Sequence, residues 1–159
     1  TRKFPSTVQI KVEEREVKYM LQFADSYVYI NNQGYMLQIT ETPLELPIIV
    51  GFKTDSQNIK AGNRLAIEDL KCLENIIKIM DSAKSNSMEN LITQIDITDA
   101  NNFKLIIESE GKTVQFGEIT DVNVNVKLLK IKEIIEREKG IQGEIYFQDE
   151  ERTVFKKNV

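Results

Sequence analysis

Hydrophobic and polar residues alternate in four short stretches near the start of the chain. In residues 7–13, Val8, Ile10 and Val12 fall on one side of an extended backbone and polar residues on the other. A period of two is typical of a half-buried strand. It recurs at residues 18–23, 27–30 and 35–40, and the last two are joined by Asn-Asn-Gln-Gly, a turn-forming sequence. The short connections predict an antiparallel meander.

Two longer stretches carry hydrophobic residues at helical spacing. The first follows Gly62 and Asn63, which offer a cap, and the polar run 81–90 is expected to end it. Its hydrophobic positions are Leu65, Leu70, Leu73, Ile76, Ile77 and Met80. The second covers residues 124–139 and ends at Gly140, with Leu128, Ile131 and Ile135 on one face. The charged residues expected on its other faces are Lys127, Lys130, Lys132, Glu133, Glu136 and Arg137. An amphipathic helix must bury one face, so we interpret both stripes as core.

Six further stretches have the composition of strands. A short buried strand at 48–51 follows a loop fixed by Pro43 and Pro47. The others are expected at 91–98, 103–109, 112–116, 143–148 and 153–157. Strands interrupted by segregated helices predict an α+β fold, a mostly antiparallel β-sheet with two α-helices packed on it. The longest connection, residues 53–63, is expected to be mobile.

Length and charge narrow the class of protein. A chain of 159 residues fits one domain, or one domain with a fragment of another. It is 41% hydrophobic, and its formal net charge of -4 comes from 21 basic and 25 acidic residues mixed along the chain. No basic stretch could follow a phosphate backbone, so no nucleic acid is expected as a partner. No run of 18 apolar residues spans a membrane, and no signal peptide is evident. The immediate start of a strand suggests a piece of a longer protein.

The residue types argue against catalysis. Histidine is absent and Cys72 is the single cysteine, which removes the commonest general base and nearly all zinc sites. Cys72 is expected to be a small core or boundary residue. Acidic residues cluster at 13–14, 108/110 and 149–151, where solvated strand ends and turns are predicted, and tryptophan is absent, so a glycosidase is not expected. Residues 96–102 lack the glycine and glutamate of a calcium loop. We predict no catalytic residue, cofactor or metal.

The last predicted hairpin is the strongest candidate for function. Residues 145–147 and 154–155 place aromatic or β-branched side chains side by side, so both faces of the hairpin are apolar. A terminal strand often lies at a sheet edge, where its free backbone groups accept a partner's strand. Alternatively, one face packs on the second helix and the other is aromatic surface. The residues alone leave both readings open.

Several segments of the chain match, in the same order, the motifs of one protein family. They are residues 4–15, Phe-Pro-Ser-Thr-Val-Gln-Ile-Lys-Val-Glu-Glu-Arg, residues 27–34, residues 46–51, and residues 104–117 with the Lys-Leu-Leu-x-Ile that begins at Lys127. These segments resemble, in turn, the end of the POTRA domain, the β-domain hairpin, the Leu-Pro-x-Ile-x-Gly element and the passage into the last helix of the FtsQ/DivIB family of bacterial cell-division proteins. The chain departs from the family pattern at Val17, at residues 144–146 and in the Gly117–Lys127 spacing.

The resemblance implies a domain organisation and a location. Residues 1–15 would be the C-terminal strand of a truncated POTRA domain, and residues 16–159 the FtsQ/DivIB β domain. The whole protein would be anchored in the bacterial cell membrane at the division septum by a single transmembrane helix that this chain lacks. The present fragment would lie on the extracytoplasmic side.

The resemblance also implies a non-catalytic divisome scaffold that binds FtsB/DivIC-like and FtsL-like partners. In the family, such partners add a strand at the last β-strand. Carried onto this chain, the partner-binding residues are Tyr146, Phe147, Thr153, Val154, Phe155 and Lys156. The alternatives are a cell-wall glycan-binding or peptidoglycan-active domain, and a purely structural POTRA-associated domain.

Overall fold

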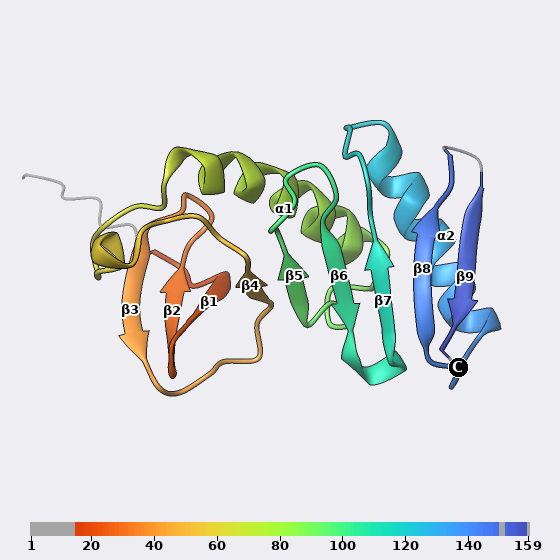
Figure 1. Ribbon diagram of the computed structural model, residues 1–159, viewed down its shortest axis with the longest axis horizontal. Helices are drawn as coiled ribbons and strands as arrows, with labels where there is room; N and C mark the ends of the chain where they lie inside the picture. Colours follow the sequence, from red (N-terminus) through yellow and green to blue (C-terminus); the bar gives the residue numbers. More distant parts are fainter. Residues whose placement is uncertain (1–14, 150–151, 159) are drawn as a thin grey trace, which may run out of the picture.

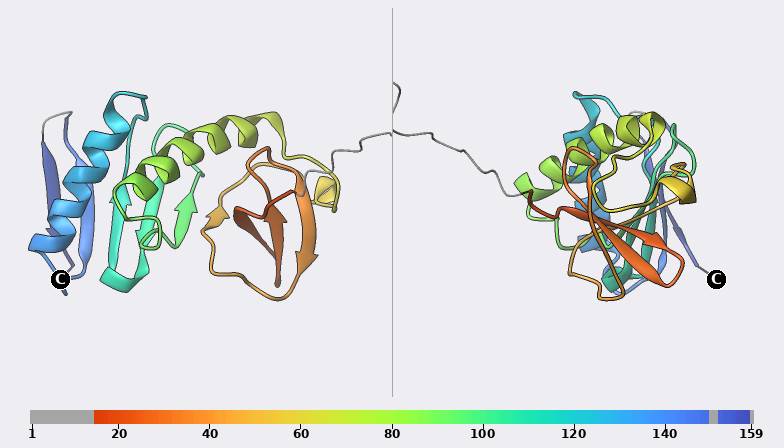
Figure 2. Two further views of the ribbon diagram at one scale, coloured as in Figure 1. Left: turned by 180° about the vertical axis from the view of Figure 1, so that it is seen from behind. Right: turned by 90° about the vertical axis from the view of Figure 1, so that its left-hand side faces the viewer.

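The computed structural model describes residues 15–149 and 152–158. In these residues a single nine-stranded sheet runs the length of the molecule, and two α-helices pack on one of its faces (Figures 1 and 2). Most neighbouring strands are antiparallel, so the predicted α+β class is confirmed. The strand expected at residues 7–13 and the proposed POTRA boundary at residue 15 lie outside, or at the limit of, the described residues.

The elements follow the predicted order closely. The strands are β1 Tyr19–Phe23, β2 Ser26–Ile30, β3 Met36–Thr40, β4 Ile48–Val50, β5 Gln94–Asp96, β6 Lys104–Ile107, β7 Lys112–Gln115, β8 Gly143–Phe147 and β9 Thr153–Lys157. The α-helices are α1 Ile67–Ser85 and α2 Asn123–Arg137, and the two short 3₁₀ turns are η1 Ser56–Asn58 and η2 Glu108–Glu110. The strands lie side by side in the order β3-β2-β1-β4-β5-β6-β7-β8-β9.

Both helices connect parallel strands. β4 leads through α1 to its parallel neighbour β5, and β7 leads through α2 to its parallel neighbour β8. Because β4, β5, β7 and β8 all run in one direction, both crossovers step the same way along the sheet. Such crossovers are almost always right-handed, and two that step the same way therefore place their helices on the same face. This explains the single helical layer seen from behind in Figure 2.

The boundaries of α1 differ from the prediction at both ends. Its N-cap residue is Ala66, not Gly62 or Asn63. The helix also continues through residues 81–85 of the polar run, because Ala83 is fully buried and extends the core-facing side by a turn. It ends where Ser87 takes a left-handed conformation with φ of 56° and the Met88 N–H bonds the Ala83 carbonyl at 2.7 Å.

A buried carboxylate near the start of α1 fastens the loop that precedes the helix. Asp69 is 2% exposed and accepts bonds from the Lys53 N–H at 2.8 Å, the Thr54 N–H at 2.7 Å and the Thr54 hydroxyl at 2.5 Å. The loop expected to be mobile is thus tied down at its beginning. One turn along α1, Cys72 is buried as predicted. Burial raises the pKa of the Cys72 thiol, and the charge of Asp69 raises it further, which keeps the thiol protonated.

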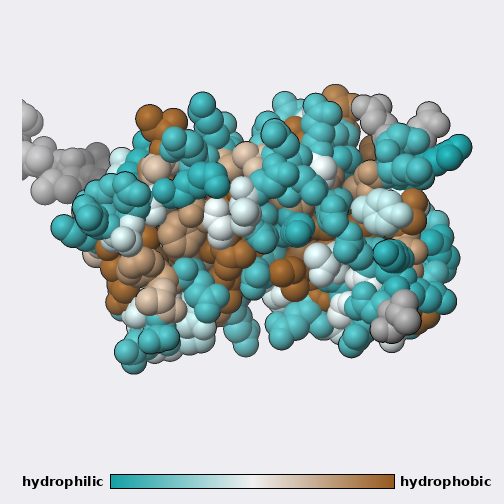
Figure 3. All heavy atoms as spheres, viewed as in Figure 1, coloured by the Kyte–Doolittle hydropathy of each residue, from teal (hydrophilic) through white to brown (hydrophobic). Residues whose placement is uncertain are grey.

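The hydrophobic core lies between the sheet and the two helices. Side chains from β1, β2, β5, β6, β7 and β8 meet Leu73, Ile76 and Ile79 of α1 and Leu128 and Ile131 of α2. The opposite face of the sheet has no helical cover in the described chain, and Figure 3 shows it as mainly hydrophilic with separate hydrophobic patches. A half-solvated sheet of this kind can use an uncovered edge or its open face for function.

Candidate partner-binding edge

The two edges of the sheet differ in how far the chain covers them. At the β3 edge, the Met36 N–H bonds the Asn63 carbonyl at 2.8 Å, and the Gly62 N–H bonds the Met36 carbonyl at 2.8 Å. Tyr35 and Arg64 add an isolated antiparallel bridge. These contacts occupy backbone groups that a partner strand would need. The β3 edge is therefore partly closed.

The β9 edge is open. β9 pairs with β8, and among the described residues no strand lies beyond it (Figure 1). The flanking bonds fix which residues face β8: the Gln148 N–H bonds the Arg152 carbonyl at 2.9 Å, and the Asn158 N–H bonds the Gln142 carbonyl at 3.0 Å. Hydrogen-bonded pairs alternate along an antiparallel ladder, so Val154 and Lys156 face β8. The N–H and C=O groups of Thr153, Phe155 and Lys157 then point away from the sheet.

Amide hydrogen exchange tests this alternation. We expect the amides of Val154 and Lys156 to exchange at least about tenfold more slowly than those of Thr153, Phe155 and Lys157, because they are bonded to β8. NMR-detected exchange on the isolated chain measures each rate. Equal protection along β9 would show that the outer groups are already engaged, and would contradict an open edge.

The two phenylalanines of the hairpin face the helical layer. The Phe147 ring meets Phe116 edge-on at 6.1 Å between centroids. The Phe155 ring lies over Gly143, so close that a Cβ there would sit 2.7 Å from the ring. Both rings are partly buried against the core. Their role is therefore to hold β8 and β9 against the rest of the sheet.

Two buried lysines fasten the same region. Lys127 is 8% exposed, and its ammonium donates to the carbonyls of Phe116 and Glu118 at 2.7 Å each while lying 5.0 Å from the centre of the Phe147 ring. Lys112 is 1% exposed and donates to the Glu138 carbonyl at 2.9 Å, at the C-terminal end of α2. Cations are favourable at that end of a helix. The prediction that placed Lys127 away from the core-facing side is wrong, because its long stem lets the ammonium reach these carbonyls.

The opposite face of the hairpin is open and mixed in character. Tyr146 is paired with Val154, and Glu144 with Lys156. Glu144 also accepts a bond from the Gln115 amide. The face therefore offers a small apolar contact beside an oppositely charged cross-strand pair, which is the sort of surface that can select the side chains of an added strand.

The structure divides the six residues expected to bind a partner. Thr153 and Phe155 supply outward backbone groups. The open-face side chains come from Tyr146, Val154 and Lys156. Phe147 instead packs on the helical face of the sheet and supports the hairpin. Sequence reasoning missed Lys157, whose backbone extends the open edge. That Lys157 faces outward follows from the alternation of hydrogen-bonded and non-hydrogen-bonded pairs along β9. This alternation can be assigned only once the β8–β9 register is known. The Thr153 hydroxyl oxygen is buried without a hydrogen-bond partner among the described residues.

Elsewhere in the described residues there is a cleft, but no metal-binding cluster and no membrane-spanning helix. No group of three or more acidic or cysteine side chains there could hold a metal ion. No described helix has the length and apolar character needed to cross a membrane. A cleft in the other half of the sheet is lined by carboxylates from four separate segments, which the acidic clusters in the sequence did not indicate, apart from Glu108.

Comparison with known proteins indicates which family this chain belongs to. A solved structure of the major extracytoplasmic domain of the bacterial cell-division protein DivIB from Geobacillus stearothermophilus is similar, with a TM-score of 0.45 and 11% identity, over 78% of this chain and 93% of that chain. No curated protein matches. The family model described as "FtsQ/DivIB, C-terminal related" matches residues 18–141. The chain therefore belongs to the FtsQ/DivIB C-terminal related family, a membership that implies a role in cell division.

Proposed function

We propose that this domain is a divisome scaffold that binds FtsB/DivIC-type and FtsL-type partners by accepting a strand along β9. In this proposal it acts on the extracytoplasmic side of the membrane at the septum, anchored by a transmembrane helix outside this chain, and performs no chemistry. The single observation that carries the proposal is the open outer edge of β9, the last strand of the sheet.

The backbone of β9 supports strand addition. Thr153, Phe155 and Lys157 each offer one N–H and one C=O at regular spacing, and each bond formed contributes about 0.5–1.5 kcal/mol net. A long unprotected edge is otherwise a liability, and natural sheets usually shorten, bulge or cover theirs. The β3 edge of this sheet is partly covered in that way, whereas no described strand covers the outer edge of β9.

The rigidity of the hairpin also supports the proposal. A preformed edge loses little conformational entropy on binding, so more of the contact energy appears as affinity. Phe147 and Phe155 on the helical side, with Lys112 and Lys127 beneath them, fix β8 and β9 before a partner arrives. The open-face residues Tyr146, Val154 and Lys156 are then free to contact alternate side chains of the added strand.

A proline substitution tests the backbone directly. The Thr153 N–H faces outward, so Thr153→Pro removes a donor from the open edge and none from the ladder to β8. We expect the variant to keep its fold and to bind a DivIC-type partner at least about tenfold more weakly, from one lost hydrogen bond plus the obstruction by the ring. Binding is measured by surface plasmon resonance and folding by thermal unfolding.

Two variants serve as controls. Thr153→Val keeps the N–H and nearly the same shape, and since the Thr153 hydroxyl has no bond within the described chain, its partner affinity should stay at the wild-type value. Val154→Pro removes a donor that faces β8 and should destabilise the hairpin itself. Wild-type affinity of Thr153→Pro would rule out strand addition at this position.

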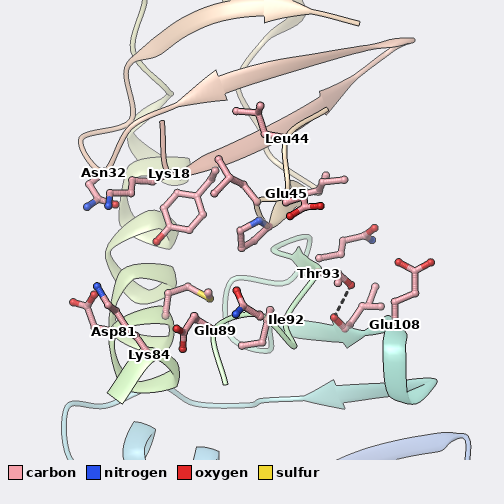
Figure 4. Close-up of a pocket in the computed structure, with 18 residues that line it drawn as sticks. Lys18, Asn32, Leu44, Glu45, Asp81, Lys84, Glu89, Ile92, Thr93 and Glu108 are labelled. Carbon is pink, nitrogen blue, oxygen red and sulfur yellow. Dashed lines mark hydrogen bonds between the residues drawn. The ribbon is translucent and has the colours of Figure 1, made fainter. Parts of the chain in front are cut away.

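The rival class is a glycan-binding or peptidoglycan-active domain. Its catalytic form needs two carboxylates facing one bond, about 5–9.5 Å apart. Carboxylates do line the cleft (Figure 4), but the chain has no tryptophan to form a sugar platform. Saturable binding of muropeptides that survives Thr153→Pro would favour this rival over the scaffold.

A further inference from the structure

A cleft is lined by the start of β1, residues 44–48, the C-terminal half of α1 and the start of β5. Its volume is about 930 Å³, at the upper end of the range for ligand sites. Figure 4 shows β1 and the 44–47 loop on one side, α1 on a second and β5 and β6 on the third. None of its lining residues belongs to β8 or β9. It is therefore a second site, separate from the partner-binding edge.

The cleft is acidic, and its charges are spread out. Four carboxylates line it against two lysines. Asp81 and Glu89 lie on one side of it, and Glu45 and Glu108 on the other (Figure 4). Of the lysines, Lys18 already forms an ion pair with Glu16 at 3.2 Å, so part of its charge is neutralised. The separation of the carboxylates fits a chain with several cationic groups better than one small cation.

One of these carboxylates is incompletely satisfied. The Glu89 Oε2 atom is buried and has no hydrogen-bond partner among the described residues. A buried carboxylate oxygen without a donor is costly, and native proteins seldom keep one unless a water, an ion or a ligand supplies the bond. Glu89 lies in the turn after α1, beside Ile92 at the cleft wall (Figure 4). An ammonium or guanidinium group bound in the cleft would complete its bonding once the Glu89 side chain turns this oxygen toward it.

The remaining walls suit the apolar parts of a polypeptide. Leu46, Pro47 and Met80 are half-buried and line the cleft, and Tyr19, which is 5% exposed, lines it with them. Burial, and to a smaller extent the charge of Asp81, raises the pKa of Tyr19 to about 12, so its hydroxyl remains a neutral donor at physiological pH. Apolar walls between carboxylates match a chain in which leucine-like and basic side chains alternate.

We propose that this cleft binds an extended basic segment of a partner protein, with Glu89 receiving a lysine or arginine side chain at the buried end. Charge complementarity and the unpaired Glu89 oxygen carry the proposal. The β9 edge and the cleft would then hold two different stretches of polypeptide on one domain.

The test uses two designed peptides. The first is the amide Gly-Leu-Arg-Gly-Leu-Arg-Gly, and the second carries glutamate in place of both arginines. We expect saturable one-to-one binding of the basic peptide by isothermal titration calorimetry, and none of the acidic one. Glu89→Gln should lower the affinity for the basic peptide by about tenfold or more, because a charge-assisted bond is lost. Asp81 is exposed, so Asp81→Asn should lower this affinity less.

Stability separates this role from a structural one. Because Glu89 Oε2 makes no bond within the described chain, Glu89→Gln should leave the melting temperature unchanged or raise it. The control Glu136→Gln, an exposed acid on α2, removes the same charge far from the cleft and should leave peptide affinity unchanged. Equal binding of the two peptides, no binding of either, or equal losses from Glu89→Gln and Glu136→Gln would overturn the proposal. Thr153→Pro should not alter peptide binding, whether or not it weakens the divisome partner.

Discussion

Replacing Asp69 with alanine should cost more stability than most single substitutions in this chain. The Asp69 carboxylate accepts bonds from two backbone N–H groups and one hydroxyl, all donated by Lys53 and Thr54. Asp69→Ala leaves these donors without their partner in a buried setting, so we expect a loss of about 3 kcal/mol. For a chain of this size, that loss lowers the melting temperature by about 6–12 °C. Thermal unfolding followed by circular dichroism measures it.

The neighbouring acid provides a matched control. Glu68 occupies the same first turn of α1 but is exposed. Glu68→Ala removes the same kind of charge from the same end of the helix and should cost about 0.3–1 kcal/mol. Similar losses from the two variants would show that the helix-end charge, and not the fastening of residues 53–54, supplies the stability. Asp69→Asn, which keeps the shape and weakens the bonds, should fall between them.

Local patterns located the strands well, even though residues 19–21 of β1 and 28–30 of β2 are buried on both faces. The alternation at 18–23, 27–30 and 35–40 corresponds to β1, β2 and β3, and the predicted last strand matches β9 residue for residue. The C-terminal end of α1 was not predictable in the same way. Its left-handed closing residue is Ser87, where glycine or asparagine usually marks the end, and the side chain that continues the buried stripe is Ala83, which carries a weak hydrophobic signal.

The parallel pairs depend on contacts between distant residues. β1 pairs with β4 and β4 with β5, and no local pattern specifies these partners. A signal was nevertheless present, since each helix stands between two strands, and parallel neighbours need a crossover of that length. The prediction treated the helices as segregated from the strands, and it therefore missed the two crossovers β4–α1–β5 and β7–α2–β8.

The candidate edge was predictable as a strand but not in its details. Aromatic residues at 146–147 and 155 indicated an apolar hairpin, yet the side of each ring depends on pairing between β8 and β9. The register places Phe155 opposite buried Ile145, on the helical side, and Val154 opposite Tyr146, on the open side. The cleft was beyond prediction, because its carboxylates come from segments that the fold alone brings together.

The position of β9 depends on the absence of a side chain at residue 143, which is glycine. A Cβ at this residue would stand 2.7 Å from two carbons of the Phe155 ring and would collide with the Lys156 carbonyl oxygen, which is backbone. Gly143→Ala must therefore push β9 away from β8. We expect a loss of about 1–3 kcal/mol in stability, as for an overpacked core. We also expect partner affinity to fall by more than tenfold, because the open edge is no longer held in place.

Two further variants identify the cause. Gly140→Ala has open space around its Cβ and a φ of 80°, so it should cost only the strain of left-handed backbone, about 1–2 kcal/mol, and leave partner binding unchanged. Combining Gly143→Ala with Phe155→Leu removes the ring contact but not the contact with the backbone oxygen. The double variant should therefore recover part of the stability, and a non-additive cycle would measure the ring's share. Purely additive losses, with partner affinity intact in Gly143→Ala, would mean that the geometry of β9 does not govern binding and that the partner docks elsewhere on the domain.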